Sequence, residues 1–363
     1  MVSPCSGAAG VRLEGRLPQW GNLGDDGLTH TEKRSGMKAI VIAQYGGPEV
    51  LEYRDVPDPL PGPEDLLVRV HAAALNRADL LQRVGGYPQP GPKPAFEIPG
   101  LEFAGEVVAI GDRVTDFAAG DRVMGLMAGG GQAEMLVTHQ RLAMKVPANL
   151  SWQEAGSTPE VYITAHDALR QCDLVAGESV LIHAAGSGVG VAAIQIAKVM
   201  GAGLVLGTAG TADKIEQAKA LGMDGGANYK SGDWAPVILE ATAGRGVDVI
   251  LDVIGAEYWD RNLRVLAMKG RMVLVGMMGG ASTQANLGAL LMKRAQVRGT
   301  TLRARPLEEK AAATKAFEKS IVPHLASGRV KVVVDRAFPL REAGAAHEYL
   351  ASNANFGKVV LTM

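Results

Sequence analysis

The chain has 363 residues, enough for two domains and for a substantial core without disulfide or metal staples. Its 37 basic and 38 acidic residues give a formal net charge of −1, so nothing in the overall charge favours nucleic acid or an anionic membrane as a partner. The only two cysteines, Cys5 and Cys172, exclude a disulfide framework and a four-thiolate zinc site, and we expect a reduced, cytoplasmic protein.

Residues 1–36 are rich in glycine, mixed in charge and without hydrophobic periodicity. They lack the apolar stretch of a secretory signal, and their acidic residues are unusual for a mitochondrial transit peptide. We interpret them as a disordered leader or tag. From residue 37 to about residue 157, short apolar runs alternate with proline-rich and glycine-rich turns, which predicts a β-rich domain.

From about residue 177 to residue 299, short apolar strands alternate with helices. This alternation predicts βαβ units and a parallel sheet, and six strands are the number in a full dinucleotide-binding domain. The overall fold class is therefore α/β. The expected strands are 179–183, 204–206, 225–227, 247–253, 272–275 and 296–299, and the expected helices are 189–200, 211–221, 234–242, 258–266 and 287–294.

The last part of the chain, from about residue 301, returns to the β-rich pattern of the first part. It predicts a helix over 307–321 and strands over 330–334 and 358–362. The pattern is consistent with a C-terminal segment that folds back onto the N-terminal domain.

The strongest local signal is Val180–Gly190, where a strand leads through Gly186, Gly188 and Gly190 into a helix. Glycines allow a tight turn and a close approach of the backbone to a pyrophosphate, and the helix N-terminus supplies free N–H groups. The spacing is not a strict G-x-G-x-x-G, because Val191 takes the place of the third glycine. Within six alternating strands, the turn predicts a dinucleotide site. Residues 179–197 contain no Asp, Glu, Lys or Arg, as a membrane helix would, but the glycines near their middle favour a strand, a turn and a helix instead.

The end of the second strand indicates which dinucleotide binds. NAD-preferring sites usually place an acidic residue there for the ribose hydroxyls, whereas this chain has small residues from Gly207 to Gly210. Lys214 offers a cation to a 2′-phosphate, although Asp213 could face the same region. We therefore predict NADPH rather than NADH.

Five phrases of the sequence are specific: ALNRADL at 74–80, PGLE at 99–102, GGGQAE at 129–134, HAAGSGVG at 183–190 and GTTLR at 299–303. With them the chain resembles, over nearly all of residues 37–363, the zinc-free quinone oxidoreductases of the medium-chain dehydrogenase/reductase superfamily. It is most similar to the stress-inducible, pro-apoptotic vertebrate members and their bacterial relatives. The resemblance implies a GroES-like catalytic domain from residues 37–157 and 300–363, a Rossmann domain at 158–299, and a homodimer or homotetramer.

The resemblance also bears on metal binding. Zinc alcohol dehydrogenases of the superfamily carry ligands at three positions that correspond here to Asn76, Leu101 and Glu160. Leucine has no donor atom and asparagine is a poor zinc ligand, so we predict no metal site. Without a Lewis acid to stabilise an alkoxide, the expected chemistry is hydride transfer to an electrophilic acceptor such as a quinone or an activated enone.

The family's site residues can be carried over one by one. Asn76 is expected to face the nicotinamide, and Tyr87 to stack on the acceptor or hydrogen-bond its carbonyl oxygen, so we predict both as catalytic. Several alternatives remain open for single residues. They are Tyr87 as a loop residue packed on proline, Tyr229 as a strand cap, Asn76 as a turn asparagine, Lys214 as a solvated helix lysine, and Met277 and Met278 as core-filling residues. The expected cofactor residues are Thr164, Ser187, Gly188, Val189, Gly210, Lys214, Tyr229, Gly276, Met277, Met278, Leu302, Arg303, Asn353 and Phe356.

The sequence thus predicts NADPH-dependent, zinc-independent reduction of a small quinone-type acceptor, with no membrane or nucleic-acid partner. Two other functions stay open. An enoyl reductase would transfer hydride to the β-carbon of an α,β-unsaturated carbonyl compound. An NADPH-binding sensor or structural protein would show little turnover.

Overall fold

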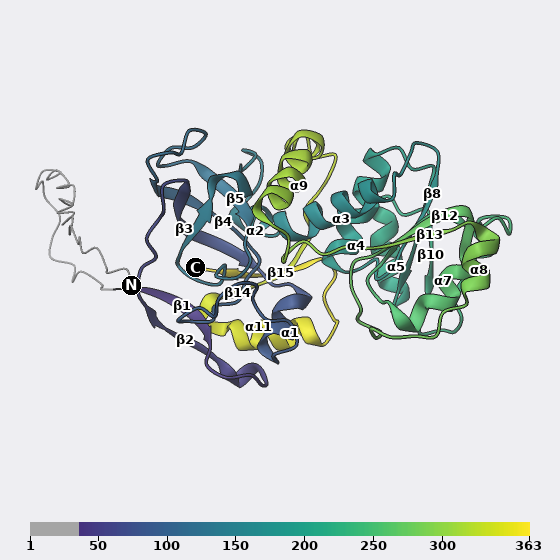
Figure 1. Ribbon diagram of the computed structural model, residues 1–363, viewed down its shortest axis with the longest axis horizontal. Coiled ribbons are helices and arrows are strands. Elements are labelled where there is room, and N and C mark those ends of the chain that lie inside the picture. The colour runs from purple at the N-terminus through teal and green to yellow at the C-terminus, as the bar shows by residue number, and fades with distance from the viewer. Residues whose placement is uncertain (1–35) are drawn as a thin grey trace, which may run out of the picture. The chain divides into compact units, whose positions relative to one another are not determined.

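The computed structural model describes residues 36–363, and Figure 1 shows how its helices and strands are arranged. Of the segment 1–36, interpreted above as a leader or tag, only residue 36 belongs to the described residues. The described chain forms a two-stranded, a six-stranded and a seven-stranded sheet. The two-stranded sheet pairs β1 (Met37–Ile42) with β2 (Leu51–Val56).

The middle of the chain builds the six-stranded sheet, in which all neighbouring strands are parallel. Its order, β10-β9-β8-β11-β12-β13, is the 3-2-1-4-5-6 order of a doubly wound dinucleotide-binding domain. The predicted six-stranded parallel Rossmann sheet is therefore confirmed. The strands are β8 (Ser179–Ile182), β9 (Leu204–Ala209), β10 (Gly225–Asn228), β11 (Val247–Asp252), β12 (Leu266–Leu274) and β13 (Gln296–Gly299).

The helices between these strands agree with the predicted ones to within one residue at either end. Strand β12 differs most, because it begins at Leu266 and not at Met272. Lys269 has a φ of 62° and the register against β11 shifts, so a bulge separates the first part of β12 from the apolar run that predicted the strand. The helices are α4 (Gly188–Val199), α5 (Ala212–Ala220), α6 (Ala235–Ala241), α7 (Trp259–Val265) and α8 (Leu287–Lys293).

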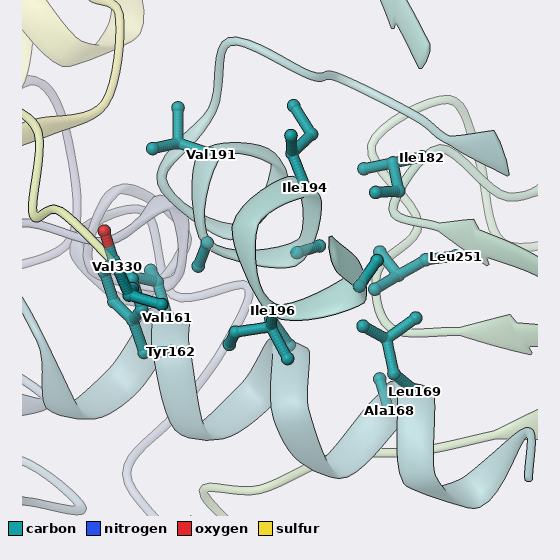
Figure 2. Packing of buried hydrophobic residues seen from close by; sticks show 14 of the residues in the cluster. Val161, Tyr162, Ala168, Leu169, Ile182, Val191, Ile194, Ile196, Leu251 and Val330 are labelled. Atoms are coloured by element: carbon teal, nitrogen blue, oxygen red, sulfur yellow. The ribbon is translucent and has the colours of Figure 1, made fainter. Parts of the chain in front are cut away.

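Helix α4, which follows the glycine turn, is buried on two sides. Figure 2 shows Ile194 and Ile196 of α4 in one buried cluster with Ile182 of the sheet and Leu169 of α3 (Pro159–Gln171). A helix enclosed in this way is apolar around most of its circumference, which explains the uncharged stretch of the sequence. None of the helices within residues 36–363 combines the length and the apolar character needed to cross a bilayer.

Both ends of the described chain contribute to the seven-stranded sheet, the GroES-like part of the fold (Figure 1). Strand β15 pairs antiparallel with β3, with Val360 opposite Ala74. The domain boundaries at residues 157 and 300 stay predictions. The sheet order is β14-β15-β3-β4-β5-β7, with β6 paired to β3, and the strands are β3 (Asp65–Ala74), β4 (Glu102–Ile110), β5 (Arg122–Leu126), β6 (Met135–His139), β7 (Ala143–Lys145), β14 (Val334–Pro339) and β15 (Lys358–Thr362).

The segment after β13 departs from its prediction. The expected strand over 330–334 is wrong, because β14 begins only at Val334. Val330 is buried in the core instead, and the backbone of Lys331 bonds to the side chains of Gln195 and Tyr162 at 2.7 Å each. These side chains satisfy backbone groups that a strand neighbour would otherwise pair. The remaining helices are α1 (Arg77–Arg83), α2 (Trp152–Gly156), α9 (Leu307–Ser320), which agrees with its prediction, α10 (Val322–Ala326) and the unpredicted α11 (Ala343–Ala351).

Candidate active site

A pocket lies at the carboxyl ends of β8, β9 and β11, where the strand order of the parallel sheet reverses. Open parallel sheets bind their ligands at such switch points. Its walls come mainly from residues 75–77, the glycine turn at 184–189, residues 209–230 and the C-terminal segment 350–358. The parallel sheet and both ends of the folded chain therefore form the pocket together.

The glycine turn brings the N-terminus of α4 to this pocket. Ser187 caps the helix, because its Oγ accepts a hydrogen bond of 3.0 Å from Gly190 N. A side chain at Gly190 would overlap the carbonyl oxygen of Ala184 and lie 2.8 Å from the backbone of Ala185. The turn therefore requires glycine at this position, and the free N–H groups of the first helical turn suit a pyrophosphate.

A buried polar network holds the strand ends behind the turn. His183, at the end of β8, bonds to Thr208 Oγ1 of β9 at 2.9 Å and to Asn262 Oδ1 of α7 at 2.7 Å. Asn262 Nδ2 donates in turn to Asp252 Oδ2, at the end of β11, over 2.9 Å. Burial lowers the pKa of His183 to about 4, so the imidazole is neutral and links the three strands rather than exchanging protons.

The part of the pocket beyond β9 is basic. Arg77, Lys214 and Lys230 line the pocket, and no Asp or Glu does. Lys214 Nζ donates to the carbonyl oxygen of Asn353, and Arg77 Nη2 donates to Asn353 Oδ1, each over 2.6 Å. Within the described residues, none of the three cations has a carboxylate oxygen within 4.0 Å. Their positive charge is therefore available to an anionic ligand.

Three side chains from distant segments meet at another wall of the pocket. Lys358 Nζ, at the start of β15, donates to Asn76 Oδ1 and to Leu75 O, both at 2.7 Å, and lies 2.8 Å from Glu102 Oε1. Asn76 Nδ2 donates to the same Glu102 oxygen over 2.9 Å. Glu102 Oε2 accepts from Glu160 N at 2.8 Å. Every polar atom of the Lys358–Glu102 pair is thus engaged.

Two further carboxyl groups, those of Asp79 and Glu160, lie beside this cluster. Asp79 Oδ2 accepts from Asn76 N at 2.7 Å and Asp79 Oδ1 accepts from Gly100 N at 3.0 Å, so this buried side chain ties the start of α1 to the segment before β4. Burial and the nearby Glu102 carboxylate raise the pKa of Glu160 to about 8. Glu160 is therefore mostly protonated at neutral pH.

The structure gathers part of the predicted site around the pocket and leaves the rest outside it. Gly210 and Tyr229 pack closely there, because a Cβ at Gly210 would lie 2.7 Å from Tyr229 Oη. The predicted residues that line the pocket are Asn76, Ser187, Gly188, Val189, Gly210, Lys214, Tyr229, Met278 and Asn353. Those outside its lining are Tyr87, Thr164, Gly276, Met277, Leu302, Arg303 and Phe356, and their roles stay predictions.

Arg303, predicted to hold cofactor, is bonded to three residues of the catalytic part of the fold. Its guanidinium is buried and donates to Ala128 O (2.8 Å), Tyr87 O (3.0 Å) and Gln82 Oε1 (2.7 Å). The guanidinium carbon also lies 5.0 Å from the centroid of the Tyr87 ring. Arg303 therefore fixes the loop that carries Tyr87.

Two protein families and several curated enzymes match this chain. The family described as "Alcohol dehydrogenase GroES-like domain" matches residues 62–148, and "Zinc-binding dehydrogenase" matches residues 188–319. A quinone oxidoreductase of Pseudomonas aeruginosa is 34% identical over 330 residues, which cover 89% of this chain and 99% of the relative.

Solved structures of oxidoreductases have the same fold as this chain. The Escherichia coli quinone oxidoreductase complexed with NADPH has a TM-score of 0.80 and 32% identity over 90% of this chain and 99% of that one. A protein described as an NAD-dependent alcohol dehydrogenase has a TM-score of 0.81 and 34% identity over 90% and 100%. The chain belongs to the quinone oxidoreductase family of the medium-chain dehydrogenase/reductase superfamily. It is an enzyme, an oxidoreductase.

In this quinone oxidoreductase, Asn76, Leu101 and Glu160 hold the three positions that carry zinc ligands in alcohol dehydrogenases. The amide of Asn76 is bonded to Lys358 and Glu102, Leu101 has no donor atom, and the pKa of Glu160 is raised by burial and by the neighbouring Glu102 carboxylate. Within residues 36–363, no three His, Cys, Asp or Glu side chains gather as a metal ion would require.

The sequence analysis did not single out Arg77, Lys230 and Lys358, which line the pocket, or Glu102, which pairs with Lys358. Lys358 offered a signal, since a lysine that opens the apolar run Val359–Leu361 must either be exposed or find a buried partner. Its partner Glu102 lies more than 250 residues away along the chain, and no local pattern identifies such a pair.

Proposed function

We propose that this quinone oxidoreductase uses NADPH to reduce quinone-type acceptors and works without zinc. The observation that carries the cofactor assignment is the charge of the pocket wall beyond β9. Arg77, Lys214 and Lys230 line it without a carboxylate. A 2′-phosphate adds about two negative charges at pH 7, which such a wall attracts and an acidic NAD-type site repels. The group therefore fits the residues present.

When bound, NADPH supplies the hydride, and the remaining contributions come from the protein. Ser187, Gly188 and Val189 offer the α4 N-terminus to the pyrophosphate. Lys214, Gly210 and Tyr229 form the 2′-phosphate end. Asn76 faces the reacting end of the pocket, and Tyr87 packs on the acceptor. Orientation and exclusion of water are the main effects expected of such a site.

The decisive experiment follows cofactor oxidation at 340 nm with NADPH and NADH against a panel of quinones and α,β-unsaturated carbonyl compounds. We expect quinones to be reduced faster than enones, and NADPH to be preferred. Faster reduction of enones would make the chain an enoyl reductase, and tight NADPH binding without oxidation would indicate a sensor or structural role.

Lys214→Ala tests the phosphate end of the pocket. The substitution is expected to raise the KM for NADPH about tenfold or more, the usual effect of removing one charged hydrogen bond, and to change the KM for NADH little. Equal losses with both cofactors would remove the assignment of Lys214 to the 2′-phosphate.

Zinc independence rests on the residues at the three positions that carry zinc ligands in alcohol dehydrogenases. Leu101 has no ligand atom, and the Asn76 amide is committed to Lys358 and Glu102. Dialysis against a strong chelator is expected to leave quinone reduction unchanged, with less than stoichiometric zinc in the purified protein. Loss of activity that added zinc restores would overturn this part of the proposal.

We also propose that the chain forms a homodimer or homotetramer. Strand β13 is an edge of the six-stranded sheet, and the neighbouring helix α8 buries none of its side chains. Leu287, Leu291 and Met292 are 70–75% exposed there. An apolar group beside an unpaired edge is typical of an interface between copies. Light scattering after gel filtration measures the mass, and Leu291→Asp is expected to shift it toward the monomer.

A further inference from the structure

The cluster of Asn76, Glu102 and Lys358 contains a buried ion pair, to which the proposed function gives no role. Lys358 and Glu102 are buried, with side chains 4% and 0% exposed. A buried ion pair contributes little net stability, because the loss of solvation offsets the attraction between the charges. Its presence at the pocket wall therefore needs another explanation.

The hydrogen bonds of the Lys358–Glu102 pair explain why it is buried at the pocket wall. The ammonium group of Lys358 donates to Asn76 Oδ1, and Glu102 Oε1 accepts from Asn76 Nδ2. If the amide rotated by 180°, its NH₂ group would face the ammonium group and its oxygen would face the carboxylate. Both contacts would be repulsive, since a lysine only donates and an ionised carboxylate only accepts. The pair therefore permits one orientation of the amide.

The orientation determines what Asn76 can offer to a bound molecule. One N–H of Nδ2 is directed to Glu102, and the other lies near Ala74 O at 3.4 Å. Oδ1 accepts from Lys358 Nζ, and the capping box of α1 adds the backbone N–H of Asp79 as a second donor. With its hydrogen-bonding positions engaged within the protein, Asn76 offers a bound molecule an amide surface of fixed position.

Lys358 also links this wall to the cofactor turn. A Cβ at Gly188 would lie 2.7 Å from Lys358 Cδ, so the stem of the lysine crosses the N-terminus of α4. The three N–H groups of its ammonium are engaged by Leu75 O, Asn76 Oδ1 and Glu102 Oε1. The lysine is therefore placed to position groups on both sides of it, and has no free donor for a phosphate.

We propose that Lys358 and Glu102 are positioning residues that fix the Asn76 amide in one orientation against the reacting end of the pocket. This inference rests on the proposed function for the identity of the ligands. The network itself does not depend on that assignment, because it is made entirely within the protein.

The test is a cycle of three variants: Lys358→Met, Glu102→Gln and the double variant. Each single variant leaves one buried charge without its partner, and we expect the Tm to fall by about 5–10 °C. The double variant removes both charges and is expected to regain most of that loss. Lys319→Met, on the exposed face of α9, controls for the type of substitution and is expected to leave Tm and kcat unchanged.

Activity and cofactor binding separate positioning from a purely structural role. In all three variants we expect kcat to fall about tenfold or more, because a misplaced group near the reacting atoms costs rate. The Kd for NADPH, measured by quenching of protein fluorescence, is expected to change less than about threefold. The double variant thus recovers stability without recovering kcat.

Three results would overturn the inference. Recovery of kcat together with Tm in the double variant would make the pair purely structural. A large rise in the Kd for NADPH with an unchanged kcat would make Lys358 a cofactor ligand. Unchanged kcat in the single variants would remove any positioning role. If the wild-type protein reduced no acceptor at all, the proposed function would fail, whereas the stability cycle would still report on the pair.

Discussion

The two ends of the pocket are built in different ways. The turn between β8 and α4 is one continuous segment of the chain, and a local bond from Gly190 N to Ser187 Oγ caps its helix, while Gly186 O also accepts from the remote Gly357 N. The wall around Asn76 takes Glu102 from β4 and Lys358 from β15, and its bonds join residues up to 283 positions apart. A local motif therefore forms one end, and tertiary packing alone forms the other.

The largest expected effect comes from breaking the local end. In Gly190→Ala the new methyl group would overlap the backbone of Ala184, which cannot move without displacing the turn. We expect the Kd for NADPH to rise about 100-fold or more, since the α4 N-terminus would leave its place. Gly299→Ala is the matched control, because a Cβ at Gly299 meets no atom within 4 Å. Equal binding by both variants would contradict the role given to the turn.

The difference between the two ends also explains what the sequence could predict. Gly186, Gly188 and Gly190 with alternating strands on either side identify the turn, because local sterics require those residues there. The prediction of strands and helices succeeded for the same reason. It failed at 330–334, where Gln195 and Tyr162 satisfy the backbone from a distance, and it missed Lys358 because its partners are remote in sequence.

The distributed end is expected to lose stability and activity together. In Asp79→Ala, the N–H groups of Asn76 and Gly100 would lose their buried acceptor. We expect a loss of about 2–3 kcal/mol in the free energy of unfolding, measured by urea denaturation, and a lower kcat because Asn76 is displaced. Asp79→Asn keeps the shape and one acceptor oxygen, so it should lie between wild type and alanine. A full loss of kcat without loss of stability would contradict this account.

Arg303 sharpens the comparison, because its hydrogen bonds suggest a second role beside the predicted one. Its resemblance to family residues predicts a cofactor contact, whereas its hydrogen bonds hold Gln82, Tyr87 and Ala128. Arg303→Lys retains the charge and loses the fork of donors. We expect the KM for a bulky quinone to rise about three- to tenfold, with an unchanged Kd for NADPH. A rise in the Kd for NADPH instead would support the original prediction.

The smallest expected effect concerns Glu160, which lies beside the distributed end and faces the charges of Glu102, Asp79, Lys358 and Arg303. Its pKa is about 8 in the folded protein, against 4.5 ordinarily, because burial and Glu102 disfavour the charged form. The unfolded chain therefore releases this proton at lower pH than the folded one. The stability that the protonated group contributes is complete below pH 4.5 and is lost as the pH rises through 8.

A glutamine at this position cannot ionise, so Glu160→Gln should remove that loss. After a discount for partial exposure, we expect the variant to be more stable than wild type by about 1–2 kcal/mol at pH 9, and by less at pH 7. Urea unfolding from pH 5 to pH 9 measures the difference, with Glu309→Gln on the exposed side of α9 as the control. Parallel pH profiles for wild type and Glu160→Gln would show that Glu160 ionises normally. The pocket wall around Asn76 and Glu160 would then be more accessible to water than its hydrogen bonds indicate.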